Sequence, residues 1–151
     1  MIQLKHYHLD KGEINMKIIV IDGQGGKMGK SVVEQIKKGH PDLRIMALGT
    51  NSIATSAMLK AGADVGATGE NPVIINSRDA DLIIGPIGIV MPNSLLGEIT
   101  PAMAEAVNTS PAHKVLIPVN RCNHYVVGCQ NLPLGDYIRM VCEYVETFIE
   151  N

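Results

Sequence analysis

The residues most able to do chemistry form a glycine-rich loop over residues 23–29, between an apolar run and a helical pattern. Glycine tolerates positive φ and lets backbone N–H groups approach a phosphate, and the amino end of the following helix adds partial positive charge. The spacing G-x-x-G-x-x-G predicts a nucleotide or dinucleotide site, with NAD or NADP as candidate cofactors. The alternative is a tight turn that binds nothing. The loop residues assigned to cofactor binding are Gly23, Gln24, Gly25, Gly26, Lys27, Met28 and Gly29.

Asp22 stands at the end of the apolar run, beside the expected phosphate position. Two unit charges about 4 Å apart repel by about 4 kcal/mol at an effective dielectric of about 20. We therefore expect the Asp22 carboxylate to point away from the ligand, to pair with Lys27 or Lys30, or to bind something other than a bare phosphate.

The second expected strand is followed by Thr50-Asn51-Ser52, without the acidic residue that usually binds a ribose in dinucleotide sites. These side chains could hydrogen-bond a ribose or a 2′-phosphate instead, and Thr50 and Asn51 are assigned to the cofactor site. If the loop binds a ligand, we expect Gly26→Val to abolish binding and to leave the fold intact.

The end of the loop, Gly29-Lys30-Ser31, also matches the end of a Walker A motif, G-x-x-x-x-G-K-S. That motif requires glycine at position 24, which is Gln24, and neither the fourth nor the fifth expected strand ends in a magnesium-binding Asp. Both parts of a P-loop NTPase site are defective, so we favour the dinucleotide type of loop.

Ligands of open parallel sheets bind at the carboxyl ends of the strands. The run Gly85-Pro86-Ile87-Gly88 would let a flat ligand pack closely there, or would form only a tight turn. We assign Gly85, Pro86 and Gly88 to the other side of the ligand. Asn120 is assigned to ligand contact, with Arg121 as a further candidate.

The sequence assigns no catalytic residue and leaves enzyme activity open. Cys122 and His124 could act as nucleophile and base, and Glu98 as a general base, but a free thiol, a lone histidine and a surface carboxylate are the simpler interpretations. No spacing of ligating residues indicates a metal site. Two alternatives to a nucleotide-binding domain remain: a small oxidoreductase or other enzyme with sites completed across a dimer, and an interaction module with a vestigial loop.

Composition and charge narrow the classes of partner. Aromatic residues make up 3% of the chain and its net charge is −2, so we expect no nucleic-acid partner. No apolar run is long enough to span a membrane, and no secretory signal is recognisable. The three cysteines, which lack metal spacing, indicate free thiols and a cytoplasmic location. An exposed apolar stretch at residues 87–91 would support a homodimer.

Strands alternating with helices must position these loops. This alternation predicts a single Rossmann-like, three-layer α/β/α domain over residues 16–151, with a mostly parallel sheet of five to six strands. We interpret residues 1–15 as a flexible leader, which is translated upstream sequence if Met16 is the native start, or as an arm that packs on a partner subunit. Strands are predicted over 17–21, 43–48, 72–75, 81–84, 115–119 and, at an edge, 125–127. Helices are predicted over 30–38, 52–60, 94–107 with a break near residue 100, and 134–149.

Several motifs along the chain carry a family resemblance. A bacterial domain-of-unknown-function family, number 3842, has runs that resemble Ile19–Gly26, Ala47–Asn51, Ala54–Ala63, Gly66–Asn71, Ile84–Ile89 and Ile117–Asn120. The resemblance extends from Met16 nearly to the end of the chain and implies a Rossmann-like character without an assigned activity. Gly26-Lys27-Met28-Gly29 is also similar to the nucleotide loop of dihydrodipicolinate reductases, but the chain has no room for their separate substrate domain.

Overall fold

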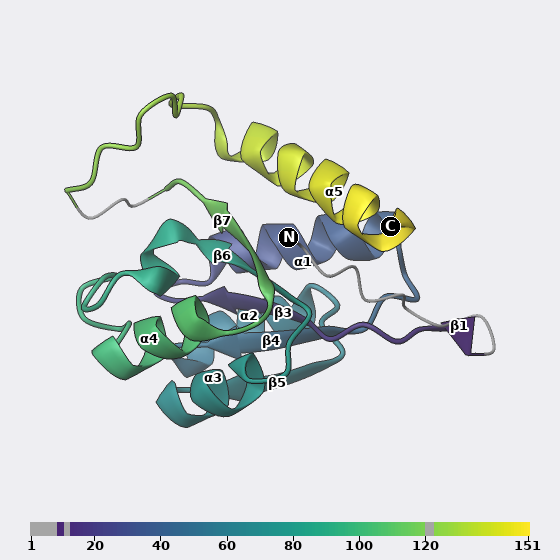
Figure 1. The fold of residues 1–151 in the computed structure, drawn as a ribbon, viewed down its shortest axis with the longest axis horizontal. Coiled ribbons are helices and arrows are strands. Elements are labelled where there is room, and N and C mark those ends of the chain that lie inside the picture. Colours follow the sequence, from purple (N-terminus) through teal and green to yellow (C-terminus); the bar gives the residue numbers. More distant parts are fainter. Residues whose placement is uncertain (1–8, 11–12, 120–122) are drawn as a thin grey trace.

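A five-stranded parallel sheet forms the centre of the computed structural model, which describes residues 9–10, 13–119 and 123–151 (Figure 1). The strands lie in the order β5-β4-β3-β6-β7. This arrangement confirms the predicted Rossmann-like α/β domain. The strands are β3 (Ile18–Asp22), β4 (Ile45–Gly49), β5 (Val65–Thr68), β6 (Leu82–Pro86) and β7 (His113–Ile117).

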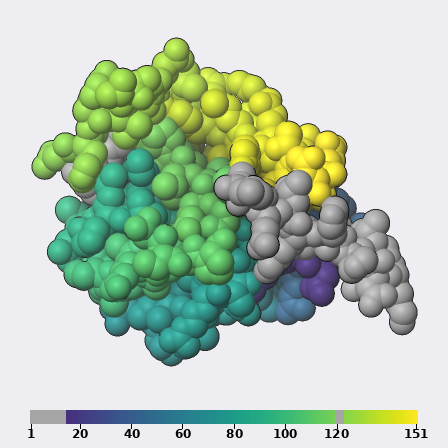
Figure 2. Space-filling view, in the orientation of Figure 1, coloured from purple at the N-terminus to yellow at the C-terminus, as the bar shows by residue number. Residues whose placement is uncertain are grey.

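Helices cover both faces of the sheet. Ile18 and Val20 of β3 pack in one apolar cluster with α1 (Lys27–Gly39), α2 (Ser52–Lys60) and α5 (Leu134–Glu150). Ile19 and Ile21 point to the other face, toward α3 (Glu70–Ser77) and α4 (Pro101–Thr109). Figure 2 shows α5 in yellow and α3 in teal at opposite sides of the molecule. Since β3 is buried on both faces, its sequence is an almost unbroken apolar run.

The direction of the chain across the sheet reverses at β3. From β3 the chain moves outward to β4 and β5, and then returns to place β6 and β7 on the other side of β3. Strands β3 and β6 are direct neighbours, with Val20 opposite Ile84. In open α/β sheets, ligands bind outside the carboxyl ends of the strands at such a reversal, which here is the edge where Asp22 and Pro86 end their strands.

The third strand was predicted in the wrong place. Residues 72–75 lie in helix α3, and the third strand is β5, which the sequence analysis missed. Pro72 is in the first turn of α3, where a missing N–H is tolerated, so it does not prevent the helix. Strand β5 reads Val-Gly-Ala-Thr and lies at an edge of the sheet with alternate residues exposed, so it has no apolar run.

Other elements also differ from the prediction. Residues 125–127 form no strand, and Tyr125 and Val127 are exposed. The helix predicted from residue 94 begins only at Pro101, after the 3-10 helix η1 (Ile87–Val90) and a series of turns over 91–99. Helix α1 begins at Lys27, three residues earlier than predicted. In the segment interpreted as a leader, β1 (Leu9–Asp10) and β2 (Glu13–Ile14) pair antiparallel. The flexibility of this segment and the choice of Met16 as native start stay predictions.

Candidate functional site

The Asp22 carboxylate lies beneath the glycine loop and binds its backbone. Oδ1 accepts a hydrogen bond from the Gly23 N–H at 2.8 Å, and Oδ2 accepts one from the Gly29 N–H at 2.7 Å. Gly29 is in the first turn of α1, where backbone N–H groups have no partner within the helix. Asp22 thus acts as an internal cap, which explains why α1 starts early.

The Asp22 side chain is turned inward. This was the first of the three outcomes expected for it, namely that the carboxylate points away from the ligand. Its side chain is buried, whereas Lys27 and Lys30 are exposed, and no ion pair between described residues joins either lysine to it. Burial raises the pKa of Asp22 above its usual value, the amides of Gly29 and Gly23 oppose the rise, and the nearby Glu98 carboxylate adds to it. The inner side of the loop is therefore already occupied by an acidic group.

Two glycines of the loop are required by close packing against α2. Gly26 has φ +71°, and a Cβ there would lie 2.6 Å from Ala54 Cα. A Cβ on Gly29 would lie 2.6 Å from Met58 Sδ. Substitution at Gly26 must therefore disturb the fold, which contradicts the expectation that Gly26→Val leaves it intact. Gly25 differs, because a Cβ there meets nothing within 4 Å.

Glu98 brings the ends of β3 and β4 together. Its Oε2 accepts the Gln24 N–H at 2.9 Å, and its Oε1 accepts the Thr50 hydroxyl at 3.0 Å and the Asn51 side-chain amide at 2.6 Å. Asn51 also donates to the Gln24 carbonyl at 2.9 Å and caps α2 by accepting the Ala54 N–H. Three of the predicted site residues are thus assembled around one carboxylate.

The turns over 91–99 hold Glu98 in this position. Leu95 is 5% exposed and belongs to the apolar cluster on the α3–α4 face of the sheet. The Asn93 N–H donates to the Ile99 carbonyl at 2.7 Å, which closes the segment on itself. Asn93, Leu95 and Leu96 all have positive φ, a conformation that is uncommon outside glycine. The sequence indicated Glu98 only as a possible base, because nothing local predicts these turns or a contact 74 residues away.

The other predicted site residues are placed differently. Gly85 and Pro86 are buried at the end of β6, and a Cβ on Gly85 would lie 2.6 Å from the Ile21 carbonyl oxygen. Gly88 is buried against Ser94. Met28 belongs to the core rather than to the surface of the loop. Asn120, with Arg121 and Cys122, lies outside the described residues.

The stretch 87–91 does not provide the exposed apolar surface on which the homodimer was predicted. Gly88 and Ile89 are buried, and Ile87, Val90 and Met91 are partly buried, because η1 packs against the end of the sheet. The homodimer itself stays a prediction.

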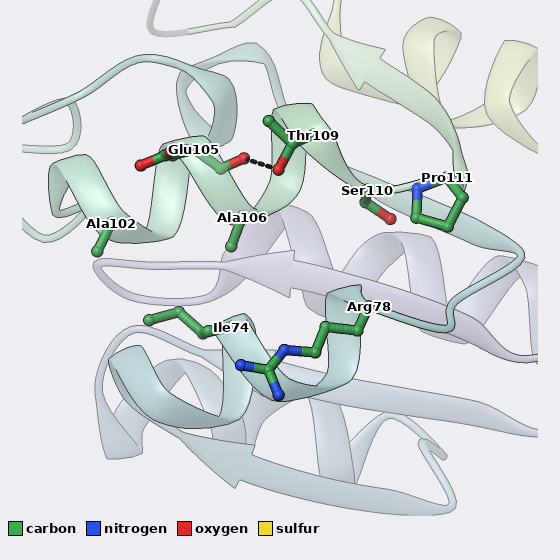
Figure 3. Close-up of a pocket in the computed structure, with 8 residues that line it drawn as sticks. All are labelled: Ile74, Arg78, Ala102, Glu105, Ala106, Thr109, Ser110 and Pro111. Carbon is green, nitrogen blue, oxygen red and sulfur yellow. Dashed lines mark hydrogen bonds between the residues drawn. The ribbon is translucent and has the colours of Figure 1, made fainter.

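A groove of about 470 Å³ lies between α3 and α4, at the opposite end of the strands (Figure 3). Ile74 lines it from α3 and Arg78 from the residue directly after α3, and Ala102 and Ala106 line it from α4. Residues 78 and 109–111, which also line it, directly precede β6 and β7, so this groove is at the amino ends of the strands. None of the predicted site residues lines it.

Among residues 9–10, 13–119 and 123–151, no group of three or more His, Cys, Asp and Glu side chains could hold a metal ion. Burial and the neighbouring Glu146 and Glu143 carboxylates raise the pKa of the Cys142 thiol. No helix in the described part of the chain has the length and apolar content needed to cross a bilayer.

A family model matches most of the chain. The model of a family described as "Domain of unknown function (DUF3842)" matches residues 17–150. No curated protein sequence and no solved structure matches the chain.

Proposed function

Since the chain belongs to the DUF3842 family, whose function is not assigned, we propose its function from the site itself: it binds a nucleotide or dinucleotide at the carboxyl ends of β3 and β4. The observation that carries this proposal is the convergence of Gln24, Thr50, Asn51 and Glu98 beside the glycine loop. These groups come from three separate loops, and they meet at the edge of the sheet where Rossmann-like domains bind their ligands.

The outer side of the loop supports a phosphate-bearing ligand better than the inner side. Asp22 occupies the inner side and accepts two backbone N–H groups. Gly25 faces open space and Lys27 is exposed, so both are accessible from solvent at the amino end of α1. A phosphate at Gly25 would benefit from the partial positive charge of α1 and from the Lys27 ammonium. NAD and NADP are the candidate cofactors.

Thermal unfolding with NAD, NADH, NADP, NADPH, ATP, GTP, FMN and S-adenosylmethionine tests the proposal. Ligand at about one hundred times its dissociation constant adds about 2.7 kcal/mol of stability, which is a shift of several degrees for a domain of this size. We expect a selective shift that is weakened by Gly25→Val, because a side chain there enters the open space above the loop. No shift with any compound would contradict the proposal and favour the interaction module.

Gly39→Val is the matched control for this substitution. Gly39 ends α1 and, like Gly25, has open space where a Cβ would lie. It is at the other end of the helix from the loop, so Gly39→Val should leave the ligand-induced shift unchanged. Equal losses in the two variants would show that the shift does not depend on the loop.

A further inference from the structure

We infer that the ligand of this site carries a free ribose diol, and that Glu98 Oε2 accepts a hydrogen bond from its 2′-hydroxyl group. The inference rests on the proposed function and specifies its ligand class. No acidic residue directly follows β4 in the sequence, but Glu98 reaches that position in space through its contacts with Thr50 at 3.0 Å and Asn51 at 2.6 Å. The carboxylate that dinucleotide sites place after the second strand is thus supplied by a different loop.

Glu98 has acceptor capacity left for a ligand. An ionised carboxylate can accept about four hydrogen bonds, two at each oxygen. Oε1 is filled by Thr50, Asn51 and a longer contact with the Gln24 N–H at 3.2 Å. Oε2 accepts only the Gln24 N–H, at 2.9 Å, from the described residues. It lies 3.4 Å from where a Cβ on Gly23 would be, beside the glycine loop, and is the oxygen that remains for a hydroxyl donor.

The charges around Glu98 select a neutral donor. A backbone amide, a hydroxyl and a side-chain amide are the donors to Glu98 that the described residues provide, and all are neutral. Asp22, whose pKa is raised in part by the Glu98 carboxylate, is also acidic. Since like charges repel strongly where water is partly excluded, a ribose hydroxyl is favoured at Oε2 and a 2′-phosphate is opposed.

The position of Glu98 is fixed before any ligand arrives. Leu95 is held in the core, and the Glu98 N–H donates to the Leu95 carbonyl at 3.1 Å. Three hydrogen bonds from the ends of β3 and β4 then orient the carboxylate. A group held in this way discriminates between ligands by geometry, because it does not turn aside to admit a second anion.

Titrations with NADH and NADPH, followed by the fluorescence of the reduced nicotinamide, test the inference. We expect the wild-type chain to bind NADH at least tenfold more tightly than NADPH. Glu98→Gln should weaken NADH binding about tenfold and strengthen NADPH binding. Glu105→Gln is the control, because Glu105 is an exposed acid on α4 outside this site. Calorimetry with AMP and 2′-deoxy-AMP tests the same hydroxyl without the nicotinamide half, and we expect AMP to bind about tenfold more tightly.

The outcomes separate this inference from the proposed function. Equal affinities for NADH and NADPH, or for AMP and 2′-deoxy-AMP, would overturn the contact between Glu98 and the 2′-hydroxyl group and leave nucleotide binding standing. Equal weakening of NADH and NADPH by Glu98→Gln would overturn the role of Glu98. If none of the four probes binds, the inference fails, and the proposed function fails too if no nucleotide shifts the melting temperature. Tighter NADPH binding by Glu98→Gln cannot result from partial unfolding, so a gain would support the inference directly.

Discussion

Gly26→Ala should destabilise the fold far more than Gly25→Ala, although the two glycines are adjacent. At Gly26 the left-handed backbone, with φ +71°, costs a residue with a Cβ about 1–2 kcal/mol. The new methyl carbon would also lie 2.6 Å from Ala54 Cα, a backbone atom, and such overpacking costs about 1–3 kcal/mol. The two effects together predict a loss of about 2–5 kcal/mol. That is a large part of the 5–15 kcal/mol or so that stabilises a typical domain.

Urea unfolding followed by circular dichroism measures this difference, because the chain has no Trp for a fluorescence assay. Each 1 kcal/mol lost from the free energy of unfolding lowers the melting temperature of a domain of this size by about 3 °C. The Gly26→Ala variant should therefore melt about 6–15 °C below the wild type. Gly25→Ala should stay within about 0.5 kcal/mol of the wild type, since its Cβ meets nothing within 4 Å. Equal stability of the two variants would refute the close packing of α1 and α2 at Gly26.

Two further predictions concern ionisable side chains. Partial burial raises the pKa of Asp64, but hydrogen bonds from Lys37 and the Ile45 N–H, with the charges of Lys37 and Arg44, outweigh it and hold the pKa below its usual value. The stabilisation from Asp64 is therefore present above a pH of about 4 and is lost as the pH falls through the lowered pKa. Lys37→Met should raise the Asp64 pKa in an NMR titration and remove about 0.5–1 kcal/mol at pH 7, and an unchanged pKa would show that the pair does not form in solution. Because the pKa of the Cys142 thiol is raised, iodoacetamide at pH 8 should alkylate Cys142 more slowly than a cysteine in an unfolded peptide. Mass spectrometry measures the two rates. Equal rates would mean that the packing of α5 does not shield the thiol.

Apolar runs and apolar stripes in the sequence predicted the strands and helices whose own residues are buried. Strand β3 reads as buried because Ile18 to Ile21 are covered on both faces, and α5 shows its apolar stripe at helical spacing. Strand β5 was missed because its four residues are small or half exposed, so that pairing with β4 rather than composition makes it a strand. Residues 72–75 are apolar enough for a strand, but they pack as one turn of α3.

The candidate site was only partly predictable for the same reason. The glycine loop and the end of β4 could be located from strand order, and the structure brings Gln24, Thr50 and Asn51 together there. The role of Asp22 as a cap depends on where α1 begins, which the loop sequence does not specify. Glu98 joins the site through turns of unusual backbone conformation, and their geometry follows from Leu95 entering the core rather than from any motif.

The reversal of the chain at β3 determines when the site can be completed during synthesis. The ribosome makes β3, β4 and β5 first, and these strands can pair in order through local βαβ units. The other edge of β3 pairs with β6, whose last residue is Pro86, and Glu98 follows twelve residues later. The central strand therefore has an unpaired apolar edge in the nascent chain, and the glycine loop is made long before the carboxylate that contacts it. The binding edge is completed only after the half of the domain that carries the loop, so a chain truncated before residue 98 would present the loop without Glu98.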